Sequence, residues 1–405
     1  MNTSQPAPST SKSDPSQTES VFIQVARTPL IPERVLKNHG AFCVIDTRFR
    51  AAARLLQCLW LREHGIATAS SDNRAGMPSP SSFGSVLSPE AANAGRNFLS
   101  PDIHRLTLQE WLMSEDDAAI DDERLFGNSL SSMPLVFNLF GALALDLELA
   151  TTVFRRLLPQ FVHSVDQIIF EHSPGRRSER YLADRTAWDL AVRVTTTDGE
   201  SATVFIETKY SESMEGPAAR MRDRYNEASR QVRLYRDPDS TVLRSAPIEQ
   251  LWREHMLAQL AVDNVITSRA VFMMIAPRLN RRVQAACRVY QAELIASDPN
   301  EPDRVGFTSL ALETVIEAIA AAGASDHAHA LWGRYCDFDR VYRLAMQELA
   351  NEAMASTATQ PTTGVQNTGK PALPPARRQT SARRQVRSGL PAQARTSRSS
   401  KQAVR

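Results

Sequence analysis

The chain has 405 residues, of which 42% are hydrophobic, so it is long enough for one large globular domain or two small ones. Its formal net charge is only +2, but the stretch from Asn351 to Arg405 carries ten Lys and Arg side chains against one acid, which leaves a mildly acidic body. The four cysteines form no CxxC pair, and this spacing argues against both a zinc site and a disulfide framework.

Both ends of the chain differ from its body. Residues 1–20 are polar and rich in Ser and Pro, without the apolar segment of a secretory signal, and no apolar run approaches the roughly 20 residues that span a bilayer. We therefore expect a cytoplasmic protein with no membrane contact. We also expect residues 1–20 and the basic segment 351–405 to be disordered tails, because neither has the large apolar residues that would offset the entropy of ordering.

Residues 21–125 have the pattern of a helical N-terminal region. Apolar side chains at helical spacing predict an amphipathic helix over Arg48–His64. The Ser, Pro and Gly content of 67–91 predicts a long loop. Short helices should follow over Asn97–Leu125, and we interpret the acidic clusters there, Glu115–Asp117 and Asp121–Glu123, as a solvated acidic face.

A second region, 126–350, begins with a largely apolar stretch. Ser131 or Ser132 can cap a helix with Pro134 in its first turn, and Pro159 stops it, so Ser131–Leu158 predicts one buried helix of six or seven turns. Asp146 and Glu148 interrupt its apolar character, and they would need partners or a wet cleft if they point inward.

Alternating and apolar segments follow in an order typical of a mixed α/β domain. The continuous apolar run AVFMMIA predicts a strand covered on both faces, which would be the last strand of the core. The expected strands are Val165–Phe170, Trp188–Val194, Ala202–Lys209 and Ala270–Ala276, and the expected helices are Arg220–Arg236 after a Gly-Pro break, Pro247–Val262, Leu310–Ala322 and Ala328–Leu349.

The sequence TTTDGE between the second and third of these strands predicts a hairpin. A three-residue loop, 197–199, with Gly199 in the left-handed conformation centres the hairpin on Asp198. Cross-strand partners then have numbers that sum to twice 198, so Asp189 should face Glu207 with Cβ atoms about 4.5 to 5.5 Å apart. Lys209 should share their side of the sheet, because side chains alternate along a strand.

Two facing carboxylates repel each other unless one is protonated or a cation lies between them. Mg²⁺ suits this position because it prefers oxygen ligands and binds one or two carboxylates while it keeps waters for a phosphate-bearing substrate; Mn²⁺ is an alternative. The main-chain carbonyl of Thr208 can add a ligand, and Lys209 would orient a metal-bound water or stabilise charge on the phosphate. The arrangement suits phosphodiester hydrolysis, whereas the simplest alternative is a charged, solvent-facing hairpin.

In this context the sequence resembles the PD-(D/E)XK nuclease superfamily, and more closely an uncharacterised bacterial family within it. The resemblance lies in SSMPLVFNLFGALALD, FEHSPGRRSERYLADRTAWDLAV and FIETKY, and extends over about 48–344. It implies a restriction-endonuclease-like central mixed sheet flanked by helices, with further helices at both ends. One departure is that Trp188 stands where the family motif has Pro.

The resemblance also implies roles for single residues. Asp189 and Glu207 would be metal ligands, and Lys209 would be the catalytic lysine. A further acid often lies on the first core helix of such proteins, and Glu148 or Asp146 can take that place, with Glu171 as a third candidate. Gln231 lies where the superfamily often has a polar residue of the active site.

Nucleic acid, with DNA as the expected substrate, is the partner that this interpretation requires. The predicted helix 220–236 is strongly basic, and its arginines are candidates for phosphate contacts, or else a solvated helix face with internal ion pairs. The candidate contacts are Arg220, Arg224, Arg230 and Arg233. The competing hypothesis is a nuclease fold without turnover that binds nucleic acid or a protein partner.

Overall fold

The computed structural model describes residues 22–69, 83–214 and 219–358. One compact unit extends to Ala355. The predicted tail 1–20, the Gly216-Pro217 break and the basic tail beyond Ala358 lie outside the described residues, whereas the last helix continues past the expected boundary at Asn351.

The five strands form one mixed sheet in the order β1-β2-β3-β4-β5. Antiparallel pairing joins β1 to β2 and β2 to β3, and parallel pairing joins β3 to β4 and β4 to β5. Their bounds are β1 (Val162–His172), β2 (Trp188–Thr196), β3 (Ser201–Thr208), β4 (Arg269–Ala276) and β5 (Gly306–Ala311). The predicted mixed sheet is confirmed, and β5 adds a strand that the sequence did not indicate.

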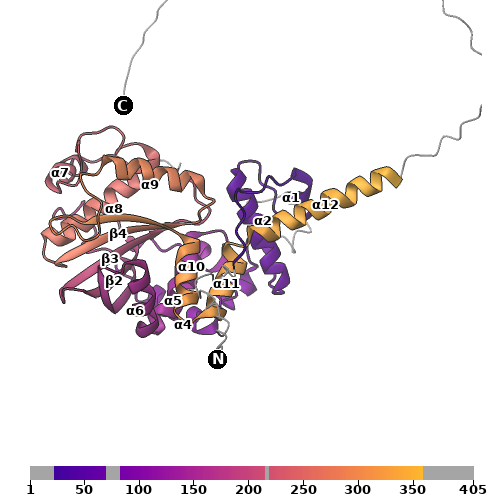
Figure 1. Cartoon of the computed structure of the whole chain (residues 1–405), viewed down its shortest axis with the longest axis horizontal. Helices are drawn as coiled ribbons and strands as arrows, with labels where there is room; N and C mark the ends of the chain where they lie inside the picture. The colour runs from indigo at the N-terminus through magenta and orange to yellow at the C-terminus, as the bar shows by residue number, and fades with distance from the viewer. Residues whose placement is uncertain (1–21, 70–82, 215–218, 359–405) are drawn as a thin grey trace, which may run out of the picture. The chain divides into compact units, whose positions relative to one another are not determined.

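Helices cover both faces of this sheet (Figure 1). One apolar core lies between the sheet and the helices on the side of α5, α6 and α10, and a second lies on the side of α7, α8 and α9. The helices are α1 (Glu33–Asn38), α2 (Arg48–Glu63), α3 (Pro89–Asn93), α4 (Pro101–Leu112), the π-helical turn η2 (Glu123–Gly127), α5 (Ser132–Leu145), α6 (Leu147–Leu157), α7 (Asp223–Gln231), α8 (Ala246–Asp263), α9 (Arg281–Glu293), α10 (Leu312–Ala321), α11 (Ser325–Tyr335) and α12 (Phe338–Ala358).

The single helix predicted over Ser131–Leu158 is wrong. The chain bends by 116° between α5 and α6, because Asp146 adopts an extended conformation and caps the second helix. Its side chain accepts hydrogen bonds from the backbone N–H groups of Glu148 and Leu149. Among the described residues no single helix is long and apolar enough to cross a membrane, and this bent pair alone meets that test by length and composition.

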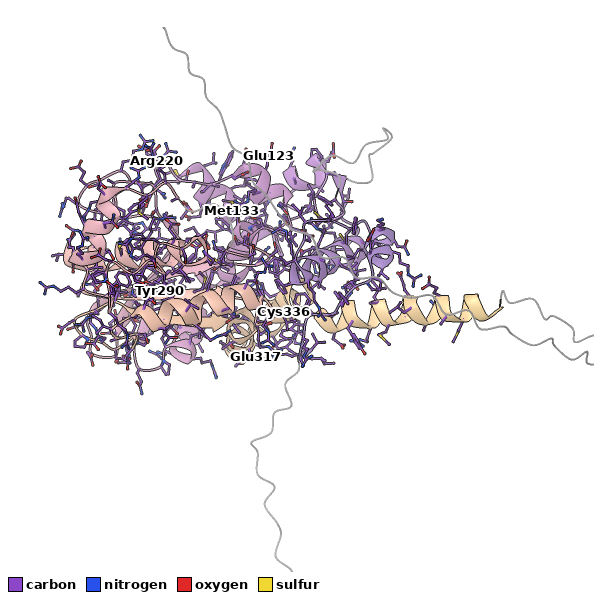
Figure 2. All side chains as sticks on the ribbon, turned by 90° about the horizontal axis from the view of Figure 1, so that it is seen from above. Glu123, Met133, Arg220, Tyr290, Glu317 and Cys336 are labelled. Atoms are coloured by element: carbon purple, nitrogen blue, oxygen red, sulfur yellow. The ribbon has the colours of Figure 1, made fainter. Side chains whose placement is uncertain are left out.

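Several other boundaries also shift. The basic helix is shorter than the predicted 220–236, since α7 spans only Asp223–Gln231. The chain after β4 forms helix α9 and then strand β5, neither of which was predicted. The helix predicted over 328–349 is two helices, α11 and α12, with Cys336 at the break between them (Figure 2). Strand β4 is buried along nearly its whole length, as the apolar run predicted for a strand with both faces covered.

Candidate functional site

The β2–β3 hairpin has the predicted register. Thr196 N–H donates to the carbonyl of Glu200 at 2.8 Å, and Gly199 closes the turn with φ +83°. The paired residues run from Thr195 opposite Ser201 to Leu190 opposite Ile206, and the two residue numbers of every pair sum to 396, as predicted. One residue further along, the same register brings Asp189 opposite Glu207 at the end of the two strands.

The three side chains of the predicted triplet lie together at this strand end. Asp189 Oδ2 accepts a hydrogen bond from the Thr208 N–H at 2.7 Å, which fixes its carboxylate against β3. Glu207 is 4% exposed, and its Oε1 accepts from the Lys209 ammonium at 2.6 Å. A half-buried lysine thus lies beside one buried carboxylate, Glu207, and one half-buried carboxylate, Asp189.

The electrostatics of the cluster reflect this crowding. Burial, followed by the negative charge of Glu207, raises the pKa of Asp189 well above its usual range. Burial by itself would lower the pKa of Lys209, but the carboxylates of Glu207, Glu254 and Asp189 outweigh it and raise that pKa. Lys209 therefore keeps its proton at neutral pH, and the three neighbouring carboxyl groups would carry more negative charge than one ammonium balances if all of them were ionised.

Helix α8 adds two residues that the sequence analysis missed. Gln250 Nε2 donates to Glu207 Oε1 and to Glu254 Oε1, at 2.7 Å in each case. The Glu254 side chain is buried, its Oε2 has no hydrogen-bond partner among the described residues, and burial together with Glu207 raises its pKa. An acid in the apolar stretch LWREHMLAQL, four residues after a Gln on the same helical face, was the available signal.

The three supporting residues that were predicted lie in different places. Glu171, at the end of β1, is close enough for Glu207 to contribute to its raised pKa, of which burial is the main cause. Glu148 is exposed in the first turn of α6, beside the capping residue Asp146. Gln231 is exposed on α7, where its side chain accepts from Arg224 at 3.0 Å. In the described chain, Gln250 makes the glutamine contact to the carboxylates.

The predicted phosphate-binding arginines divide into two pairs. Arg220 and Arg233 are exposed. Arg224 donates to the carbonyl of Tyr181 at 2.7 Å, and Arg230 forms an ion pair with Asp239 at 2.8 Å. The second pair therefore holds surrounding loops in place, and its guanidinium groups are already engaged.

Of the two acidic clusters interpreted as a solvated face, Asp121–Glu123 is exposed, whereas Glu115–Asp117 is paired with basic side chains at the end of β1 and in the loop that follows it. Glu115 contacts His172 at 2.8 Å and Arg176 at 3.3 Å, and Asp117 contacts Arg177 at 2.6 Å. These contacts join the α4 region to the loop between β1 and β2, which leads directly to Asp189. The sequence could not show this pairing, because the partners are about 60 residues apart.

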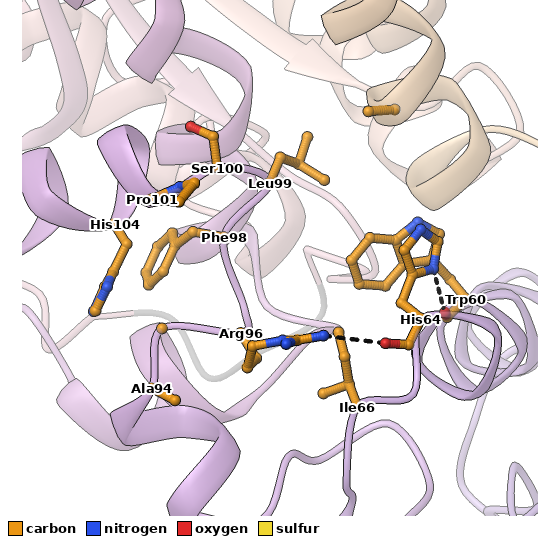
Figure 3. Close-up of a pocket in the computed structure, with 12 residues that line it drawn as sticks. Trp60, His64, Ile66, Ala94, Arg96, Phe98, Leu99, Ser100, Pro101 and His104 are labelled. Atoms are coloured by element: carbon orange, nitrogen blue, oxygen red, sulfur yellow. Dashed lines mark hydrogen bonds between the residues drawn. The ribbon is translucent and has the colours of Figure 1, made fainter.

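A separate cavity of about 380 Å³ lies among the N-terminal helices (Figure 3). Trp60 and His64 form one side, and Phe98 and His104 lie across from them, with Arg96 donating to the carbonyl of His64 at 3.1 Å. None of the predicted site residues lines it.

The described residues contain no group of three or more His, Cys, Asp or Glu side chains spaced to hold a metal ion. The set at the strand end is smaller: two carboxylates, Asp189 and Glu207, and the main chain of Thr208. Such a set is compatible with Mg²⁺, which takes one or two carboxylates and keeps several waters.

Comparison with known proteins gives one result. The model of the PD-(D/E)XK nuclease superfamily matches residues 44–337, which include the whole sheet and every element around the strand end. No curated protein and no solved structure matches the chain.

Proposed function

The chain belongs to the PD-(D/E)XK nuclease superfamily, and from this premise we propose that it is a metal-dependent nuclease that hydrolyses phosphodiester bonds, with DNA as its substrate. The observation that carries the proposal is the strand-end cluster, in which the hairpin register sets Asp189 against Glu207 and Lys209 donates to Glu207 at 2.6 Å. Membership of the superfamily supports nuclease activity in general, and the geometry of the strand end supports the choice of Asp189, Glu207 and Lys209 as the residues of the site.

Asp189 and Glu207 would hold a divalent cation, together with the Thr208 carbonyl. The donor set fits such an ion, because the pKa of Asp189 is raised by burial and by the neighbouring carboxylate, so the pair gains from a positive charge between its members. When bound, the ion would acidify a water and stabilise negative charge on the phosphate.

The chain's own residues contribute positioning and charge. Gln250 and Lys209 both donate to Glu207 Oε1, so they fix the orientation of that carboxylate and leave its second oxygen for a ligand. The protonated Lys209 would stabilise charge that develops on the phosphate oxygens, or orient the attacking water. Asp189 is held by the Thr208 N–H, which limits its rotation at the strand end.

The test is cleavage of DNA and RNA panels by purified protein, with and without Mg²⁺ or Mn²⁺. We expect metal-dependent cleavage of DNA that falls by at least about 100-fold in Asp189→Asn and in Lys209→Ala, a loss typical of removing a group that stabilises transition-state charge. Arg105→Ala is the matched control, since Arg105 is an exposed arginine of α4 that pairs with Asp102.

Activity that survives both substitutions would show that the assigned residues are wrong. Tight nucleic-acid binding without any turnover, under every metal condition, would instead support the hypothesis of a nuclease fold that acts as a binding module.

A further inference from the structure

The cavity of about 380 Å³ among the N-terminal helices is formed mainly by three neighbouring parts of the chain. These are the C-terminal end of α2, the segment 94–100 that connects α3 to α4, and the start of α4. Its volume is within the range of small-molecule sites, about 300 to 1,000 Å³. None of the residues that line it belongs to the strand-end cluster, so the proposed cleavage does not account for it.

Two pairs of stacked rings form opposite sides of the cavity (Figure 3). The ring centroids of Trp60 and His64 are 4.1 Å apart, and those of Phe98 and His104 are 5.5 Å apart. His64 is exposed and His104 is half-buried, so ring surface remains accessible to a ligand on both sides. Rings on opposite sides of a cavity favour a flat aromatic ligand, because such a ligand can stack on each of them.

The position of the His104 ring depends on a glycine. Gly95 adopts φ +69°, and a Cβ at this position would lie 2.2 Å from His104 Nδ1, so glycine allows the ring to pack directly against the main chain. Phe126 contacts the same ring edge-on, with centroids 6.4 Å apart. This side of the cavity is therefore fixed by packing before any ligand binds.

The histidines of the cavity have hydrogen-bonding capacity left for a ligand. His64 Nδ1 lies 2.8 Å from the Trp60 carbonyl and so donates to it, which leaves Nε2 as an acceptor in the neutral ring. Burial lowers the pKa of His104, so its neutral ring offers one donor and one acceptor, and neither nitrogen has a partner among the described residues. Donors and acceptors of this kind can recognise the edge of a nitrogen heterocycle.

The charge of the cavity is positive. Arg96 is exposed, and its Nη2 donates to the His64 carbonyl at 3.1 Å. Within the part of the chain that the structure describes, no carboxylate pairs with Arg96 and none lies among the lining residues. A neutral carbonyl holds the guanidinium in place without cancelling its charge, so Arg96 can pair with an anionic ligand, and arginine suits phosphate in particular.

We propose that this cavity binds a nucleotide, with the base between the two pairs of rings and a phosphate at Arg96. Among aromatic anions, a nucleotide uses all three features: the rings stack on the base, the histidines contact its edge, and the arginine contacts the phosphate. The inference goes beyond the proposed function, because the cavity takes a ligand of its own apart from the strand-end cluster.

Two sources can supply this nucleotide: a free nucleotide, or a nucleotide of a single strand. Both present a base and a phosphate, so the chemistry that the cavity recognises is the same. AMP and a short single-stranded oligodeoxyadenylate distinguish them, because the strand has to continue out of the cavity whereas the free nucleotide does not.

The experiment is isothermal titration calorimetry of the full chain with AMP, adenosine, ribose 5-phosphate and the oligodeoxyadenylate. EDTA is present throughout, so that no divalent cation holds a phosphate at the strand end. Arg96→Ala removes the cation of the cavity, and His64→Ala removes the exposed ring of one side. Arg62→Ala is the matched control, because Arg62 is an exposed arginine of α2 that contacts His39, carries no ion pair to a carboxylate in the described chain, and does not line the cavity.

We expect AMP to bind more tightly than adenosine, and ribose 5-phosphate to bind least. Arg96→Ala should weaken AMP binding about 10-fold, as for the loss of a charge-assisted hydrogen bond, and should leave adenosine binding unchanged. His64→Ala should weaken the binding of AMP and adenosine alike by about 5-fold, because it removes a stacking surface. Arg62→Ala should change neither. An Arg96 effect on AMP alone identifies a free nucleotide, and an equal effect on the oligonucleotide identifies a nucleotide of a strand.

A wild-type protein that binds none of these ligands would overturn the proposal, and so would equal effects of Arg96→Ala and Arg62→Ala on AMP binding. A loss of AMP binding in Lys209→Ala as large as that in Arg96→Ala would also overturn it, because it would place the ligand at the strand end. A cleavage assay keeps the proposed function separate. Metal-dependent cleavage without nucleotide binding refutes the cavity alone, and Arg96-dependent nucleotide binding without any cleavage refutes the nuclease alone.

Discussion

Two polar clusters of this protein keep charged side chains away from water, and they differ in how those charges are compensated. In the first, Arg334 of α11 is fully buried and donates to Asn97 O at 2.8 Å and to Gln57 Oε1 at 3.3 Å, while its guanidinium stacks over Trp60. None of these described partners is a carboxylate. In the second, at the strand end, Asp189, Glu207 and Glu254 share a single ammonium, that of Lys209.

The difference is in how completely each cluster is satisfied. Neutral oxygens and an aromatic face surround the Arg334 charge, which is the pattern of a group that holds elements together. At the strand end, like charges lie close together and Glu254 Oε2 has no partner among the described residues. Unfavourable interactions of this kind persist where a ligand relieves them, so the second cluster has the character of a binding site.

The largest expected effect on stability comes from breaking the first cluster. Arg334→Met should lower the free energy of unfolding by about 3 kcal/mol, because it leaves the buried side-chain oxygens Asn97 Oδ1 and Gln57 Oε1 without the donor that Arg334 provides. Urea denaturation of both proteins measures the change. Arg105→Met serves as the control, since the exposed Arg105–Asp102 pair should contribute less than about 1 kcal/mol. Equal stability of Arg334→Met and the wild type would contradict the structural role.

A second effect, of about 2 kcal/mol, should come from His255. Its Nε2 lies 2.8 Å from the Val305 carbonyl, so Nε2 donates, and Nδ1 accepts from the Tyr290 hydroxyl at 2.8 Å. The ring is therefore held neutral, and burial lowers its pKa to about 4. The unfolded chain binds this proton near pH 6.5, so the contribution to stability is complete above that pH and is lost as the pH falls towards 4.

The measurement is the free energy of unfolding at pH 7 and at pH 5. His255→Gln should show a smaller decrease than the wild type by about 2 kcal/mol, whatever its stability at pH 7. If the two proteins lose the same stability between these pH values, His255 does not titrate as its burial requires.

Local signals in the sequence predict the hairpin and its register, because Gly199 defines the turn and large apolar side chains recur at every second position of β2. The break at Asp146 was not predictable in the same way. An aspartate is tolerated within a helix, and only its capping contacts to the next helix show the bend. Strand β5 was missed because it leads directly into α10, so the two read as one apolar segment.

The candidate site likewise contains residues that the sequence predicts and residues that it does not. Asp189, Glu207 and Lys209 are close through one hairpin, so their relation follows from the sequence. Gln250 is 43 residues from Glu207, and packing of α8 against the sheet brings them together. No local pattern encodes such a contact, which is also why Gln231 was the candidate and Gln250 was not.

The smallest predicted effect on stability tests the comparison most directly. Asp189→Asn retains an oxygen that accepts from the Thr208 N–H, but it removes one of the carboxylates that face Glu207. We therefore expect the variant to be as stable as the wild type without divalent cations, or more stable by up to about 1 kcal/mol. Mg²⁺ should raise the melting temperature of the wild type, since a ligand stabilises the state that binds it, and should raise that of the variant much less. A variant that is clearly less stable than the wild type in EDTA would show that Asp189 belongs, like Arg334, to the groups that hold the fold together.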